Sequence, residues 1–186
     1  MATGTLAASP RLLARTAGAL YLLTIVLGIF SVLQLGSNLD SVQNAADLIG
    51  TIAYAVVTLL LYVLLKPVNP TISLAAALIS LIGCVIGGLG IYNIHPIHVN
   101  SLVFFGVYCS LLAYLMYNST FLPKTIGVLL LISGLGWLTY IWPPLEHAIS
   151  PLPMITGLAG EGGLTLWLLI FGVNEERWSA KARASA

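Results

Sequence analysis

Hydrophobic positions dominate this chain in long unbroken runs, and they do not alternate with polar positions. Six runs are about 20 residues long, the length that an α-helix needs to cross a hydrocarbon core about 30 Å thick. They predict an all-α, polytopic membrane protein in which six transmembrane helices form one domain over residues 1–186. The continuous runs exclude a transmembrane β-barrel, whose strands alternate apolar and polar residues. The predicted spans are residues 12–35, 46–65, 71–94, 99–118, 124–142 and 154–173.

The breaks between the runs contain residues that favour chain reversal. Glycine, proline and asparagine gather there, and these residues mark turns. The first run follows Arg11 and Arg15, as the apolar part of a signal peptide would follow a basic segment. It is longer than that part, however, and no small-residue cleavage site follows it. We therefore expect the first run to remain as a membrane helix.

Composition agrees with the run pattern. Hydrophobic residues make up 59% of the 186 residues and charged residues only 7%, with a net charge of +1. A soluble domain has about 25% charged residues, so this chain could not cover a water-facing surface. An ordinary soluble enzyme, a disordered protein and a nucleic-acid-binding protein with a basic face are excluded. The expected partner is the lipid bilayer.

The basic residues predict the orientation of the spans. With six spans, all seven lysines and arginines fall on the same side of the membrane. Basic residues are enriched in cytoplasmic loops, so both termini are expected in the cytoplasm. The histidines and Glu146 then fall on the outer side.

Small residues form stripes along two of the predicted helices. Such stripes allow helices to approach closely in lipid. We favour packing inside the bundle over a homodimer seam, because every bundle needs such faces; a homo-oligomer or another membrane protein as partner stays open. The first stripe contains Ala14, Ala17, Tyr21, Thr24, Gly28 and Ser31, and the second contains Ser73, Ala76, Ser80, Gly83, Gly87 and Gly90.

Glu161 is the acidic residue that lies within an apolar run. It is about seven residues into the sixth span, roughly 10 Å below the outer edge. A carboxyl group at this depth is expected to be protonated or paired, and it marks a functional site by default. Its role could be a proton carrier or a counter-charge for a cationic ligand, while a neutral carboxyl that only bridges helices is the alternative. The predicted hydrogen-bond partners are Tyr54, Tyr108, Tyr140 or Gln34.

A second group of candidates lies in the outer loops. His95 and His98 share one loop, and Glu146 and His147 share another. Imidazole and carboxylate groups are suitable zinc or copper ligands. The spacing matches no metal motif, however, so solvated loop histidines are the preferred interpretation. Asp47 opens the second span, where an acid interacts favourably with the helix dipole.

Four segments resemble one bacterial membrane family, called domain of unknown function 4386. The fairly specific motifs are FLPK-x-x-G-VLL-x-x-x-GLG and the final GE-x-x-L-x-LWLL. The resemblance extends over nearly all six spans. The four segments read ARTAGALYLLTIVLGIFS, LLLYVLLKPVN, FFGVYCSLLAYLMYNSTFLPKTIGVLLLISGLGWL and GEGGLTLWLLIFGVN.

The resemblance implies six spans and a bacterial inner membrane, and it implies no particular activity. It also implies that Asp47 and Glu161 occupy acidic positions of the family. Members of the family often carry an acid near Tyr54, a histidine near Tyr108 and an acid near Tyr140. This chain has tyrosine at all three positions, so a family site built on those groups would be altered here.

Three functions fit these residues. The first is a non-enzymatic bundle that binds or transports a small ligand, with Glu161 lining a polar path. The second is a membrane enzyme or a redox or metal protein with a site at the outer face, built from the histidines and Glu146. The third is a structural or assembly partner of other membrane proteins. The sequence names no ligand or cofactor, and it leaves open whether the protein is an enzyme. A cavity that reaches Glu161 from outside would favour the first function.

Overall fold

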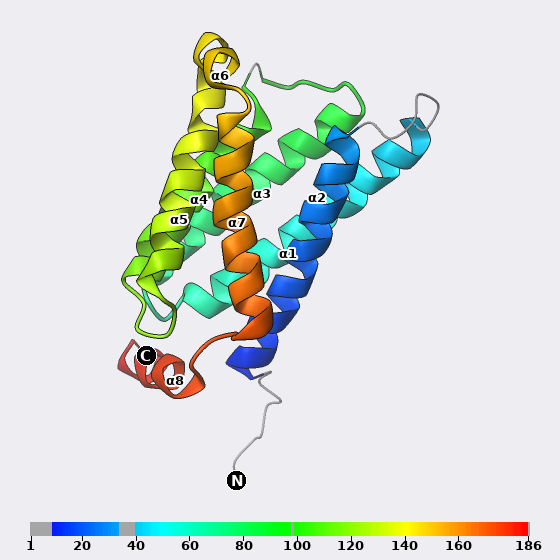
Figure 1. The fold of residues 1–186 in the computed structure, drawn as a ribbon. Helices are drawn as coiled ribbons and strands as arrows, with labels where there is room; N and C mark the ends of the chain where they lie inside the picture. The colour runs from blue at the N-terminus through cyan, green and yellow to red at the C-terminus, as the bar shows by residue number, and fades with distance from the viewer. Residues whose placement is uncertain (1–8, 34–39, 98, 186) are drawn as a thin grey trace.

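The chain folds into helices joined by short connections (Figure 1). A computed structural model describes residues 9–33, 40–97 and 99–185, and this part contains no strand. The prediction of an all-α fold is confirmed. In chain order the elements are α1 Pro10–Val32, α2 Asp40–Leu65, α3 Pro70–Ile91, α4 Ser101–Tyr117, α5 Lys124–Leu138, the short 3-10 helix η1 Thr139–Ile141, α6 Pro143–Ile149, α7 Leu152–Ile170 and α8 Glu175–Ala184.

Five helical segments are long and apolar enough to cross a membrane. They are α1, α2, α3, α5 continued by η1, and α7. The helix in the fourth predicted span, α4, is also apolar but has 17 residues. The chain therefore has the helices of a multi-pass membrane protein, five of them of spanning length.

Local caps shift the helix ends away from the ends of the apolar runs. α2 begins at Asp40, before the predicted start at residue 46, because the polar residues there continue the helix beyond the apolar run. The Asn69 side chain caps α3 by accepting a hydrogen bond from the Ile72 backbone N–H at 3.0 Å. α7 ends before the predicted residue 173, where Gly172 adopts a left-handed φ of +66°. Helices α6 and α8 lie outside the predicted spans, since hydropathy reports burial in lipid and not helix formation.

The six longest apolar helices form a closed ring. α1 packs against α2, α2 against α3, α3 against α4, and α4 against α5. α5 then packs against α7, and α7 packs against α1. The core of the ring contains the fully buried side chains of Tyr21, Tyr108, Leu61 and Leu164. α8 lies across one end of the bundle, near the start of α1 (Figure 1).

Small residues bring neighbouring helices close together. A Cβ atom placed on Gly83 of α3 would lie 3.0 Å from Phe104 Cβ of α4. A Cβ atom placed on Gly18 of α1 would lie 3.0 Å from the Leu169 backbone nitrogen of α7. Both glycines therefore pack inside the bundle. Gly83 belongs to the predicted stripe on α3, whereas Gly18 lies outside the predicted stripe on α1.

Helices α1 and α7 diverge toward the end of the bundle that is remote from α8 (Figure 1). Gly18 is in close contact with α7, but a Cβ atom on Gly28, further along α1, would meet no atom of the described residues within 4 Å. The ring is therefore tight near α8 and open between α1 and α7 at the opposite end.

Candidate functional site

Glu161 of α7 accepts hydrogen bonds on both of its carboxyl oxygens. The Tyr21 hydroxyl of α1 donates to Oε2 at 2.6 Å, and the Trp137 indole N–H of α5 donates to Oε1 at 2.6 Å. The Cys109 thiol of α4 lies 3.9 Å from Oε1. Three helices besides α7 thus direct donors at this carboxyl group. No salt bridge to Glu161 occurs within the described part of the chain.

A second tyrosine extends this network. The hydroxyl groups of Tyr21 and Tyr54 lie 3.3 Å apart, and their rings meet edge to face with centroids 5.3 Å apart. When Tyr21 donates to Glu161, its oxygen can accept from Tyr54. A continuous hydrogen-bonded chain then leads from Tyr54 through Tyr21 to Glu161.

A cavity of about 480 Å³ reaches Glu161 from the open side of the ring. The lining residues that carry polar side-chain groups are Tyr21, Thr24, Tyr54, Trp137 and Glu161, and apolar residues form most of the remaining wall. Because Glu161 lines this cavity, its side chain is only partly buried. We call this space the Glu161 cavity. The apolar wall includes Ile29, Val32, Leu102, Met154 and Leu158.

Asp47 lines a neighbouring cavity of about 280 Å³ together with Thr51 and Ser101. This Asp47 cavity shares Thr24, Gly28, Tyr54 and Phe105 with the Glu161 cavity. Tyr54 therefore borders both spaces, one next to each of the predicted acidic residues.

The structure corrects the predicted partners of Glu161. Tyr54 acts through Tyr21 and makes no direct bond to the carboxyl group. Tyr108 is buried with its ring 6.1 Å from the Tyr54 ring, and its hydroxyl has no hydrogen-bond partner among the described residues. Tyr140 lies on η1 and lines a different cavity. Gln34 lies outside the described residues. The predicted partners were chosen by depth, but depth does not fix which way a helix is rotated.

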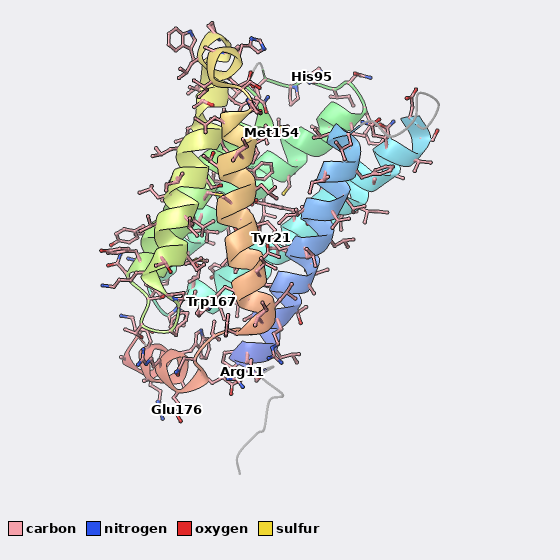
Figure 2. All side chains as sticks on the ribbon, in the orientation of Figure 1. Arg11, Tyr21, His95, Met154, Trp167 and Glu176 are labelled. Carbon is pink, nitrogen blue, oxygen red and sulfur yellow. The ribbon has the colours of Figure 1, made fainter. Side chains whose placement is uncertain are left out.

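The four candidates for a metal site are only partly brought together, and two of them, Glu146 and His147, lie on helix α6 and not in a loop. Glu146 Oε2 and His147 Nε2 lie 3.5 Å apart and share a cavity of about 330 Å³ with Tyr140. His95 is an exposed residue beyond the end of α3 (Figure 2), and His98 lies outside the described residues. Over the three described ranges, no three His, Cys, Asp or Glu side chains form a group that could hold a metal ion.

Sequence reasoning missed the two strong donors to Glu161. A signal for Tyr21 was present, because it is a large polar residue within a stripe of small residues that faces the bundle (Figure 2). Trp137 also left a signal, since an indole N–H in an apolar run needs an acceptor. The missing information was the pairing of α1 and α5 with α7.

This arrangement allows two kinds of chemistry. A carboxyl group in an apolar cavity can bind a cation or a hydrogen-bond donor on a small molecule. It can also exchange a proton along the chain of Tyr21 and Tyr54 hydroxyl groups.

Comparisons with known proteins agree with this architecture. The chain is 29% identical over 162 residues to an uncharacterized protein of Archaeoglobus fulgidus, an alignment that covers 79% of this chain and 93% of the relative. No solved structure matches the chain. The family described as "Domain of unknown function (DUF4386)" matches residues 16–98 and 94–172. These two matched segments cover the four sequence segments that carry the resemblance, apart from a few residues at the ends of those segments. The chain therefore belongs to the family of domain of unknown function 4386.

Proposed function

We propose that this is a six-span protein of the bacterial inner membrane that binds or transports a small ligand at Glu161. The observation that carries this proposal is the Glu161 cavity, which connects an intramembrane carboxyl group with the outside of the bundle. Pockets with apolar walls and a few convergent polar groups are typical ligand sites.

The packing of α4 supports a sixth span. α4 lies in the ring between α3 and α5, both of which are of spanning length. An apolar helix in that position shares the depth of its neighbours. The seven basic residues are located at the end of the bundle where α8 lies, which supports cytoplasmic termini under the positive-inside rule.

The ligand that fits best is a small apolar molecule with a cationic or hydrogen-bond-donating end. The carboxyl group of Glu161 has no cation partner among the described residues. Bringing a ligand cation to it would balance a buried charge, which is otherwise costly in a membrane. Ile29, Val32 and Leu158 would contact the apolar part of such a ligand.

The tyrosine chain supports proton movement as a second function of the same site. Tyr54 lines both the Asp47 cavity and the Glu161 cavity. Asp47, Tyr54 and Glu161 would then accept and donate a proton in turn, with Tyr21 between Tyr54 and Glu161. The Tyr108 ring would pack against the Tyr54 ring and hold it in position. Tyr140 would act in the separate cavity that it lines together with Glu146. Such a path would couple ligand movement to protons.

Binding of a lipophilic cation tests the proposal. Purified full-length protein in detergent is titrated with tetraphenylphosphonium, and bound cation is measured by equilibrium dialysis. Glu161→Gln keeps the size of the side chain and removes its charge, so affinity should fall at least about tenfold. Glu176→Gln, on the exposed surface of α8, is the matched control and should bind like the wild-type protein.

A second variant keeps the test valid if Glu161→Gln does not fold. Gly28→Leu places a side chain into the open space of the Glu161 cavity, where a Cβ atom meets nothing within 4 Å. This variant should fold and lose binding. Unchanged binding by Glu161→Gln and Gly28→Leu would contradict the proposal.

A further inference from the structure

A separate cavity of about 400 Å³ lies at the end of the bundle that carries α8. Its wall comes from the start of α1, the α4–α5 connection, the end of α7 and the start of α8. Figure 2 shows Arg11 and Trp167 at this end, far from His95 and Met154. It shares no lining residue with the Glu161 cavity. We call it the α8-end cavity.

Two arginines line this cavity. Arg11 contributes from α1 and Arg177 from α8, and both residues are exposed. Arg177 uses Nη1 to donate to the Thr120 carbonyl oxygen at 3.3 Å, which orients its side chain toward the α4–α5 connection. An arginine has five N–H donors, so most donors of Arg177 remain free for a ligand.

The positive charge of these two groups is not balanced by a salt bridge. Within the described ranges, neither Arg11 nor Arg177 has a carboxylate oxygen within salt-bridge distance of its guanidinium. The nearby Glu175 carboxylate accepts from the Arg11 backbone N–H at 3.4 Å. Glu175 does not line the cavity.

An aromatic wall adjoins the arginines. The rings of Trp167 and Phe171 are tilted by 33° with their centroids 4.4 Å apart, and both residues line the cavity. Aromatic residues at the end of a membrane helix lie at the level of lipid headgroups. The cavity thus combines cationic groups with an apolar surface at the depth where headgroup and acyl chain meet.

We propose that the α8-end cavity binds a phosphate group through Arg11 and Arg177. Guanidinium groups match the planar arrangement of phosphate oxygens and can bind them with two hydrogen bonds each. Basic pockets at the cytoplasmic ends of membrane helices hold the headgroups of anionic lipids. The phosphate could belong to such a headgroup or be free in solution, and the two sources share the same recognition chemistry.

Native mass spectrometry of the full-length protein tests this site. Protein in mild detergent is titrated with phosphatidylglycerol, with phosphatidylcholine and with inorganic phosphate in separate arms. Arg11→Ala combined with Arg177→Ala should weaken phosphatidylglycerol binding at least about tenfold. Lys181→Ala combined with Arg183→Ala removes the same charge from the far end of α8, outside the cavity, and should leave binding unchanged.

Each outcome bears on the proposal. Selective loss with phosphatidylglycerol supports a lipid headgroup site, and selective loss with inorganic phosphate supports a free phosphate site. Equal loss in both double variants would show general charge attraction and overturn the proposal, as would no binding in any arm. If the first double variant does not fold, Arg177→Gln replaces it, because this variant changes only one exposed side chain. Its affinities for phosphatidylglycerol and inorganic phosphate are then compared with those of Lys181→Gln, and the same outcomes apply.

Discussion

Single hydrogen bonds determine how Glu161 is held inside the bundle. Its two carboxyl oxygens are each bound at 2.6 Å, one by Tyr21 and one by Trp137. The two donors come from helices on either side of α7, since α1 and α5 both pack against it. The carboxyl group therefore fixes α7 to both neighbours as well as facing the cavity.

Removing either donor should destabilise the protein. Tyr21→Phe and Trp137→Phe each leave one carboxyl oxygen without its strong donor, and we expect a loss of about 1–2 kcal/mol in the free energy of unfolding. Tyr54→Phe should have a smaller effect, because its hydroxyl contacts Tyr21 at 3.3 Å and does not reach Glu161. Unfolding in a detergent titration, followed by circular dichroism, measures all three variants. A larger loss for Tyr54→Phe than for Tyr21→Phe would contradict this order.

At this scale the sequence singled out Glu161 but not the side chains that donate hydrogen bonds to it. Glu161 stood out because a carboxyl group interrupts an apolar run. Its partners come from other helices, and their identity depends on which helices are neighbours and how each is rotated. An apolar sequence gives little information on helix neighbours or helix rotation, since lipid-facing and protein-facing positions are both hydrophobic.

Among the elements, α1 has two halves with different roles. Near α8 it packs tightly against α7 through Gly18, while further along it borders the Glu161 cavity at Gly28. The stripe of small residues predicted packing inside the bundle. Its members Ala14 and Ala17, in the first half, are buried, whereas Gly28, in the second half, lines a cavity.

Alanine at these two glycines should have opposite effects. Gly18→Ala brings a Cβ atom to 3.0 Å from the α7 backbone, and such overpacking costs about 1–3 kcal/mol. Gly28→Ala meets nothing within 4 Å and gains about 0.8–1 kcal/mol of helix propensity. The midpoint of thermal unfolding in detergent should therefore fall for Gly18→Ala and rise for Gly28→Ala. Equal shifts would show that α1 does not diverge from α7.

Helix α8 is attached to the bundle by a side chain that hydropathy did not identify. The Trp178 indole N–H donates to the Leu64 carbonyl oxygen at the end of α2, at 2.8 Å. This bond occupies a carbonyl group that the end of α2 leaves free of helical partners.

Loss of this bond should release α8. We expect Trp178→Phe to increase hydrogen exchange at the backbone amides of residues 175–184 by about fivefold or more, because a net hydrogen bond contributes about 1 kcal/mol. Trp142→Phe, an exposed tryptophan at the opposite end, is the control and should leave exchange in α8 unchanged. Mass spectrometry of the exchanged protein gives both values.

For the whole molecule, the apolar runs were sufficient to predict a helical membrane protein. The sequence predicted six spans, whereas the structure has five helices of spanning length, because the helix in the fourth apolar run, α4, has 17 residues. The closed ring itself could not be predicted. A crescent of the same helices would show the same hydropathy, and only the contact between α1 and α7 distinguishes the two.

The proposed orientation predicts which residues are reached from outside the cell. His147→Cys and Glu176→Cys place thiols at exposed positions on opposite ends of the bundle. Because Cys84 and Cys109 are buried, they should give little background. A membrane-impermeant maleimide should label His147→Cys in intact cells and Glu176→Cys only after permeabilisation. The reverse pattern would place both termini outside.

The contact between α1 and α7 joins helices from opposite ends of the chain, whereas most other neighbours in the ring are successive helices. A seam of this kind can widen without straining a connecting loop. Because the open side of the ring bears apolar residues such as Val32 and Leu158, the Glu161 cavity would be filled sideways from the lipid. Occupancy would then follow the concentration of ligand dissolved in the bilayer, so a weakly binding but strongly partitioning molecule could saturate the site at a low aqueous concentration.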